Sequence, residues 1–412
     1  MKKYVGRSPR AAVVTTIALI VSSASVVTVS AAVPSSGDGR IHGCYRTSAS
    51  LTDAKGALRT IDSDAGQSCA SGEAALNWSP QGKTGGTIRK DLAGKYVYDV
   101  TFRNQDLKGV SLAGATVADV IIGNSDGDNV NAAGVTMNHL TMTETSFKGA
   151  NFSGATLYDI NVPEIPVPDD ETTNIRQNID FRNANFSNAH IGKIYASFYY
   201  FEIDFRGANV NNLTFTDSMG GVNFSGADFR SAHFVPTDPY GIIFPESNFS
   251  NTNFSGMTLD NIGFNDIPSS ISHADFSNTT ITRMNVHMLR PMNGGASYAN
   301  FTNANIDNSI FTITYLANAN FKDTVIRNTD FGSSTFTDAD FTGADIKDVS
   351  FYGAKLDTVN FTNARLENVN FMYASLDQAN LTGTTLINVT CSDGVNSDAN
   401  GGSCAGHLVR PN

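Results

Sequence analysis

The chain has 412 residues, a formal net charge of −11 and only 16% charged side chains. An excess of negative charge repels phosphate groups, which argues against a nucleic-acid-binding protein. The negative charge is compatible with a protein that binds cations or mimics nucleic acid.

Residues 1–32 have the pattern of a secretory signal peptide. Lys2, Lys3, Arg7 and Arg10 precede an apolar run, and the small residues 30–32 offer a cleavage site. The alternative is an uncleaved membrane anchor, because the run is nearly long enough to span a bilayer, although its many Ser and Thr residues weaken it as a span. Cleavage removes four positive charges and no acidic ones, so the formal charge becomes −11 − 4 = −15. We expect a secreted or envelope-associated protein with no stable membrane insertion after cleavage.

A small cysteine-containing module is expected at residues 33–85. The segment from Ile41 to Gly82 resembles a short segment that exported actinobacterial proteins carry ahead of repetitive stalks. We interpret it as an N-terminal cap, because an open repeat end exposes apolar side chains and strand edges.

A repeat of five residues dominates the chain from Phe301 to Leu386, where every fifth residue is Phe, Leu or Ile. This period fits neither a helix nor a plain strand, so it indicates a repeat architecture. Two residues before each large residue stands Ala, Ser, Thr or Val, which is the alternation of a very short strand. The two residues after it are often Thr-Asn, Thr-Gly or Ser-Gly, which are typical of turns.

This unit resembles the pentapeptide repeat family, as in Ala299-Asn300-Phe301-Thr302-Asn303 and Ala339-Asp340-Phe341-Thr342-Gly343. The resemblance implies an all-β fold, a right-handed quadrilateral β-helix with four pentads in each coil. At steps of twenty residues, like side chains should stack in ladders; two of these are Phe301, Phe321, Phe341, Phe361 and Phe311, Phe331, Phe351, Phe371. The solenoid should cover residues 86–390, with a length on the order of 60 Å at ~4.8 Å per coil.

The same unit recurs upstream in shifted frames, with insertions at 161–177, 235–241, 266–273 and 288–297. The frame at 123–146 is not fixed by the sequence. Insertions in solenoids often gather on one face that binds a partner. An aromatic cluster of Tyr195, Phe198, Tyr199 and Tyr200 predicts an exposed patch for a glycan or protein; the alternative is a loop packed on the rod.

Four cysteines form two local pairs, Cys44 with Cys69 and Cys391 with Cys404. Of three possible connectivities this local pairing is favoured because a rod separates its ends, and an exported chain can oxidise them. A zinc site is the alternative, but no ligand spacing typical of zinc is present. Residues 391–412 should then form a disulfide-closed C-terminal cap.

Chemical motifs are sparse. Asn396, Asp398 and Asn400 match the start of a calcium loop, but His407 stands where a bidentate Glu is required, and turn formation explains these residues equally well. Asp169-Asp170-Glu171 could be read as an acid–base group, and a solvated loop is the simpler interpretation. We therefore expect no catalytic residues, no enzyme activity and no cofactor, with calcium as the only candidate.

The function that these features favour is a secreted, non-catalytic structural or interaction protein that presents a rigid acidic rod to an unknown protein or glycan. One alternative is a DNA mimic that interacts with gyrase, as some proteins of the family are; export argues against it. Another is a carbohydrate-binding or carbohydrate-active β-helix. The resemblance also makes end-to-end homo-oligomers possible, although a closed C-terminal cap disfavours them.

Overall fold

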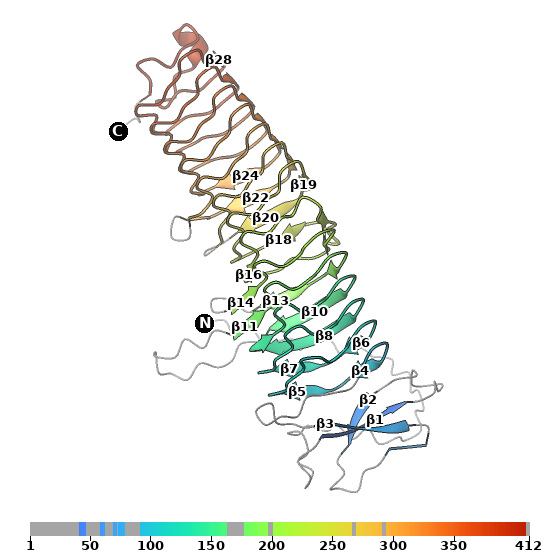
Figure 1. Ribbon diagram of the computed structural model, residues 1–412. Helices are drawn as coiled ribbons and strands as arrows, with labels where there is room; N and C mark the ends of the chain where they lie inside the picture. The colour runs from blue at the N-terminus through green and yellow to red at the C-terminus, as the bar shows by residue number, and fades with distance from the viewer. Residues whose placement is uncertain are drawn as a thin grey trace, which may run out of the picture.

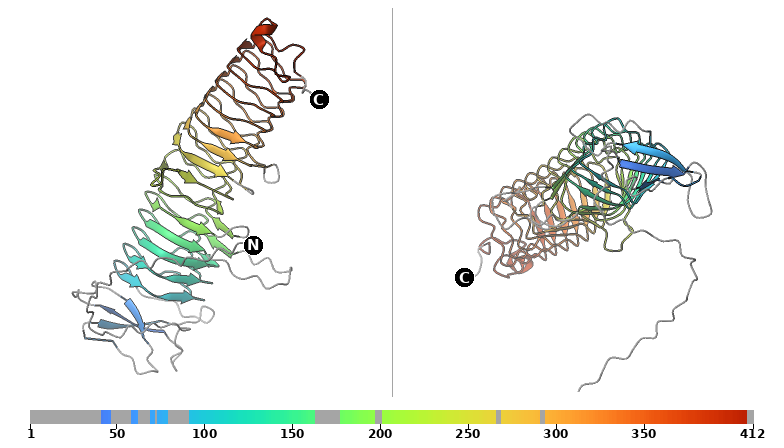
Figure 2. Two further views of the ribbon diagram at one scale, coloured as in Figure 1. Left: turned by 180° about the vertical axis from the view of Figure 1, so that it is seen from behind. Right: turned by 90° about the horizontal axis from the view of Figure 1, so that it is seen from below.

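The computed structural model describes residues 41–46, 58–61, 69–71, 73–78, 91–162, 177–196, 201–265, 269–290 and 294–408. These residues form a long, all-β solenoid of about 13 turns, in which short parallel strands stack along one axis (Figures 1 and 2). The predicted fold class is confirmed. A 3-10 helix, η2 (Ser397–Asn400), lies at the C-terminal tip.

The strands form four sheets that run along the rod. The 13-stranded sheet contains β1 (Ile41–Arg46), β2 (Leu58–Ile61), β3 (Glu73–Trp78), β4 (Tyr96–Tyr98), β5 (Thr101–Arg103), β6 (Thr116–Ala118), β7 (Ile121–Gly123), β8 (Thr136–Thr143), β10 (Thr156–Val162), β12 (His190–Ile191), β13 (Ile194–Ala196), β15 (Thr214–Phe215) and β17 (His233–Phe234). One four-stranded sheet contains β9 (Thr145–Ser146), β11 (Gln177–Asp180), β14 (Phe201–Asp204) and β16 (Val222–Asn223). The other contains β18 (Ile242–Ile243), β20 (Ile262–Asn265), β22 (Asn285–His287) and β24 (Ile310–Thr312). The seven-stranded sheet contains β19 (Thr258–Asp260), β21 (Thr280–Thr282), β23 (Asn305–Asp307), β25 (Val325–Arg327), β26 (Asp345–Lys347), β27 (Arg365–Glu367) and β28 (Thr385–Ile387).

Four columns of large apolar side chains fill the interior, one column for each pentad of the coil. We name them A to D by their regular members: A is Phe301, Phe321, Phe341, Phe361, Leu381; B is Ile306, Ile326, Ile346, Leu366, Leu386; C is Phe311, Phe331, Phe351, Phe371; D is Leu316, Phe336, Leu356, Leu376. Parallel pairing at intervals of twenty residues, such as Ile326 with Ile346 and with Ile306, aligns each column. All of these side chains except Leu381 and Leu386 at the C-terminal end are buried. Burying each of them contributes roughly 1.5–3 kcal/mol.

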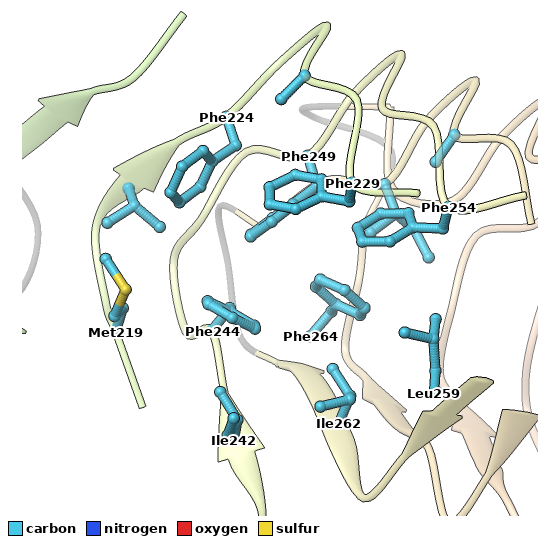
Figure 3. Close-up of a cluster of buried hydrophobic side chains, with 14 of the residues drawn as sticks. Met219, Phe224, Phe229, Ile242, Phe244, Phe249, Phe254, Leu259, Ile262 and Phe264 are labelled. Atoms are coloured by element: carbon cyan, nitrogen blue, oxygen red, sulfur yellow. The ribbon is translucent and has the colours of Figure 1, made fainter. Parts of the chain in front are cut away.

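Aromatic rings stack within a column and meet edge to face between columns. The Phe321 and Phe341 ring centroids lie 4.6 Å apart at an angle of 2° between planes, so the rings follow the spacing of the coils. In the middle of the rod the Phe244 and Phe249 rings, from adjacent columns, meet at 4.9 Å and 64° (Figure 3). This arrangement fixes the position of each coil on the next.

The structure fixes the frame of residues 123–146, which the sequence left open. Pairing runs without interruption from Asp106 through Asp126 to Ser146, which places Gly127 in column D between Leu107 and Phe147. In the same coil Ala132 occupies column A, because Asn131 pairs with Ser111 and with Asn151. The period was hidden because two small residues stand at positions that hold Phe or Leu elsewhere.

A small cavity lies in the first coils, near these two positions but not lined by Gly127 or Ala132 themselves. Its volume is about 30 Å³, and its lining is entirely apolar: Leu92, Val97, Phe102, Leu107, Val110, Leu112, Val117, Ile122, Val130, Met137 and Phe147. The first coils are filled mainly by Val and Leu, whereas Phe fills the later ones. The N-terminal part of the rod is therefore less tightly packed than the remainder.

The polar positions of the pentad hold the turns together. The Asn or Asp before the column residue accepts a hydrogen bond from the backbone N–H two residues later, as Asp340 does from Thr342 at 2.9 Å. The second residue after the column residue often adopts a left-handed conformation, as Asn303 does with φ 58°. Asn and Asp predominate at this position because their side chains tolerate that conformation. Much of the acidic and Asn-rich composition thus serves the local backbone.

The N-terminal strands continue one face of the solenoid. β1 pairs in antiparallel fashion with β2 and β3, and β2 in turn pairs with β4 of the first coil through Leu58 and Val97. Cys44 and Cys69 form a disulfide, and Cys391 and Cys404 form the other. The predicted pairing is confirmed at both ends. Among the residues that the structure describes, no helix is long and apolar enough to cross a membrane.

Candidate interaction surface

Four interruptions of the repeat fall between the same two faces of the solenoid. Each lies after a strand of the column C face and before the next column D residue: residues 163–176 follow β10, 197–200 follow β13, 266–268 follow β20, and 288–295 follow β22. The backbone bonds from Ile271 to Gly295 and from Ala296 to Tyr315 restore column D after the last two. The predicted insertion at 235–241 differs, because it joins β17 of the column B face to β18.

Several predicted site residues lie outside the described residues. These are Phe198, Tyr199 and Tyr200 of the aromatic cluster, together with Asp169, Asp170 and Glu171. Of Tyr195 the structure describes only the backbone, which belongs to β13 and pairs with Asn161 of β10. The aromatic patch stays a prediction.

An apolar strip lies on the column C face of the last coils, and the sequence analysis missed it. It consists of Ile310, Ile313, Tyr352 and Tyr373, which are 44%, 42%, 46% and 39% exposed. The Tyr352 and Tyr373 rings, from neighbouring coils, meet at 5.3 Å and 81°. Between the two isoleucines and Tyr352 the intervening coil presents Asp330, Gly332 and Ser333. The signal in the sequence was an apolar residue at pentad positions that elsewhere hold Asn, Asp, Ser or Thr.

Two members of this strip are in an unfavourable backbone conformation. Ile313 and Tyr373 have φ of 55° and 62° at the pentad position that most often carries Asn, Asp or Gly, and the coils between them carry Ser333 and Gly353 there. A β-branched residue in the left-handed region is a genuine outlier and costs on the order of 1–2 kcal/mol.

The column B face carries charges of alternating sign instead. Arg327 of β25 forms an ion pair with Asp345 of β26 and donates to the Asp345 carbonyl oxygen at 2.6 Å. Lys347 of β26 lies 2.8 Å from Glu367 of β27. Hydrogen bonds from Lys347 and Arg365 lower the pKa of the Glu367 carboxyl. Exposed pairs of this kind contribute little to stability because solvent screens them, so this face is solvated and locally neutralised.

The calcium candidate residues are engaged in the C-terminal turn. Asn396 caps η2 by accepting a hydrogen bond from the Asp398 backbone N–H, and Asp398 accepts one from the Asn388 N–H, both at 2.9 Å. The Asn400 amide donates to the Ser403 carbonyl oxygen at 2.9 Å. Within the described ranges, no group of three His, Cys, Asp or Glu side chains is placed to hold a metal ion. Each of the three side chains therefore has a structural role in this turn. Calcium binding stays a prediction.

Comparison with known proteins identifies the repeat. The family model described as "Pentapeptide repeats (8 copies)" matches residues 128–161, 223–261, 314–353, 326–363 and 350–386. No curated protein matches the chain.

Solved structures with a similar fold include QnrB1, a plasmid-mediated fluoroquinolone resistance protein, at 15% identity, over 43% of this chain and 75% of that one, with a TM-score of 0.23. HetL, a pentapeptide repeat protein involved in heterocyst differentiation regulation in the cyanobacterium Nostoc sp., matches at 15% identity over 73% and 91%, with a TM-score of 0.13. A pentapeptide repeat protein from the Arabidopsis thaliana thylakoid lumen matches at 26% identity over 33% and 68%, with a TM-score of 0.12. At these TM-scores the matches carry no argument about function.

Proposed function

The chain is a pentapeptide repeat protein, and from that premise we propose that it is a secreted, non-catalytic interaction protein. The rod acts as a rigid scaffold that presents one face to a protein or glycan in the envelope or outside the cell. The observation that carries this proposal is the apolar strip, Ile310, Ile313, Tyr352 and Tyr373, on a rod whose other described surfaces are mainly polar.

The rod gives the strip a rigid base. Directly beneath it Phe311, Phe351 and Phe371 of column C are buried, so the exposed side chains stand on a packed ladder. Aromatic and aliphatic side chains on a rigid support bind at low cost in conformational entropy. The strip also lies beside the corner between the column C and column D faces, where the four interruptions of the repeat fall in earlier coils.

The oxidised cysteines support the export part of the proposal. Disulfides persist in oxidising compartments and are rare in the cytosol, and this chain has one at each end of the rod. The pattern of residues 1–32 agrees with the same compartment. A cytoplasmic partner such as gyrase does not.

A binding assay with matched variants tests the proposal. The purified protein is immobilised and exposed to envelope extracts and to a glycan array, alongside the Tyr352→Ser/Tyr373→Ser double variant. The control is Tyr240→Ser, because Tyr240 is 82% exposed in the 235–241 segment, outside the strip. We expect one ligand whose binding is lost in the double variant and kept in the control. Ligands that bind all three proteins equally would contradict the role of the strip.

A further inference from the structure

We infer that the column B face of the N-terminal coils binds a neutral, extended glycan that lies along the rod. The inference goes beyond the proposed function, because it concerns a surface other than the apolar strip and names the chemical class of its ligand. It starts from the side chains that the strands of this face present on either side of column B.

Short parallel strands make this face regular. β4, β6, β8 and β10 follow one another along the N-terminal half of the rod (Figure 1), and β12 continues the series. Two rows of positions run across these strands, one on each side of column B. The tyrosine row consists of Tyr98, Ala118, Asn138, Tyr158 and Gly192, and the threonine row of Tyr96, Thr116, Thr136, Thr156 and His190.

The two rows carry no Asp, Glu, Lys or Arg. The same face near the C-terminal end is different, because β25, β26 and β27 present the alternating charges described above. A charged ligand group placed on the two rows would lose water without gaining an ion-pair partner there, which is unfavourable. The composition of the rows therefore favours a neutral ligand.

Tyr158 provides an aromatic support that lies against the sheet. A Cβ atom at Gly192, one coil later in the tyrosine row, would be 2.4 Å from Cδ2 of Tyr158 and 3.0 Å from its Cε2. The ring therefore occupies the space that any larger residue at Gly192 would need. Tyr158 is nevertheless 47% exposed, so much of the ring is open to a ligand.

The other end of the tyrosine row is aromatic as well. Tyr98 stands three coils before Tyr158, which corresponds to ~14 Å at the spacing of stacked strands. The Tyr98 ring lies 5.6 Å from the Tyr96 ring, at an angle of 57°. The small buried residue Ala118 follows Tyr98 one coil later, which repeats the order of residues at Tyr158. Two aromatic supports are thus held at a fixed distance by the coils between them.

Carboxylates line one edge of the tyrosine row. In four successive coils the residue after the row is Asp99, Asp119, His139 and Asp159, each with φ between 53° and 56°. The Asp119 side chain is 69% exposed, and Nε2 of His139 lies 3.0 Å from an Asp159 carboxylate oxygen. Carboxylates accept hydrogen bonds from hydroxyl groups and repel other anions, so this edge selects against acidic sugars.

These features together define a glycan. The C–H groups on one side of a sugar ring pack against an aromatic face, and its hydroxyls exchange hydrogen bonds with carboxylate, Thr and Asn side chains. A straight row of supports requires a chain that extends in one direction, as β-linked cello-oligosaccharides do and helical α-linked chains do not. A protein partner would instead need an apolar interface core, whereas the positions between the tyrosines hold only small or polar side chains.

Calorimetric titration of the full chain tests the inference. The probes are the neutral hexamers cellohexaose and mannohexaose, with maltohexaose as the helical control and hexagalacturonate as the acidic control. The variants are Tyr158→Ala, which removes the ring, and Gly192→Ala, whose Cβ would displace it. The matched control is Tyr240→Ala, because Tyr240 is 82% exposed and lies outside the two rows.

We expect saturable binding of a neutral β-linked hexamer that Tyr158→Ala and Gly192→Ala each weaken by about tenfold or more and that Tyr240→Ala leaves unchanged. Because a substitution in the rod could loosen a coil, hydroxyl-radical footprinting of the unaltered protein is measured as well. The bound hexamer should protect Tyr98 and Tyr158 and leave Tyr240 reactive.

Failure of both neutral hexamers to bind, equal binding by Tyr158→Ala, tighter binding of either control sugar, or an unchanged footprint would overturn the inference. So would an envelope protein, or a second copy of the chain in sedimentation, that Tyr158→Ala releases while no hexamer binds, since the face would then be a protein interface. Tyr352→Ser/Tyr373→Ser should leave hexamer binding unchanged, which separates this outcome from a failure of the proposed function.

Discussion

Replacing Val117 with Ile should stabilise the N-terminal coils. Val117 lies in column B between Val97 and Met137, is 3% exposed and lines the apolar cavity of about 30 Å³. Ile adds one methylene, whose burial contributes about 0.8 kcal/mol. Filling the void removes a further penalty of about 0.7 kcal/mol, at about 24 cal/mol per Å³. The gain in local stability should lie between about 0.8 and 1.5 kcal/mol.

The matched control is Val286→Ile. Val286 is a completely buried valine of column C, between Phe264 and Phe311. It does not line the cavity described above. An extra methylene there must displace its neighbours, which costs about 1–3 kcal/mol. The two substitutions are chemically identical, so the difference in sign isolates the effect of the cavity.

Hydrogen exchange resolved by segment is the appropriate assay, because coils of a repeat protein open in part rather than all at once. Val117→Ile should slow exchange in residues 91–147 by about four- to twelvefold at the free energies given above, with residues 301–387 unchanged. Faster exchange in residues 91–147, or equal effects of the two substitutions, would refute the interpretation of this region as underpacked.

Other predictions follow from single contacts. Phe321→Ala should cost about 3–5 kcal/mol in chemical denaturation, because Phe321 stacks between Phe301 and Phe341 at 4.7 and 4.6 Å; a cost below about 1 kcal/mol would contradict the ladder. Ile313→Asn should stabilise the protein by about 1 kcal/mol, since Asn tolerates φ 55°, and should weaken binding to the strip; a lower melting temperature would contradict the strain. Burial raises the pKa of the Asp180 carboxyl, but hydrogen bonds from the Arg182 side chain and backbone outweigh it and lower the pKa. The stability that this pairing contributes is present above the ordinary carboxyl pKa and is lost as the pH falls through the lowered pKa of Asp180. Thermal melts should therefore show a melting temperature that declines below about pH 4 and is constant above pH 4. A maximum of the melting temperature in that acidic range would be inconsistent with the pairing.

Much of the fold could be predicted because the five-residue period specifies the strand, turn and core positions of every coil. Every coil repeats the same strand, turn and core residue, so the columns through Phe301 and Phe311 could be assigned from spacing alone. The repeat frame could not be assigned at Gly127 and Ala132, because these two column positions lack a large apolar side chain. The backbone pairing of the structure assigns the frame there, and this pairing cannot be derived from the spacing of apolar residues.

The surface was harder to predict for a physical reason. The sequence drew attention to the dense aromatic cluster around Tyr199, whereas the strip of Ile310, Ile313, Tyr352 and Tyr373 is spread over 64 residues and forms only when coils stack.

The proposed export of the disulfide-closed rod is tested most directly on the protein as it occurs in its native cells. Cells and medium are fractionated, free thiols are alkylated at once, and the intact protein is sequenced from its N-terminus and weighed. We predict a chain that begins near Val33, outside the membrane, with all four cysteines unalkylated. A chain that retains residues 1–32 in the cytoplasm, with four alkylated cysteines, would contradict it and direct attention to a cytoplasmic partner.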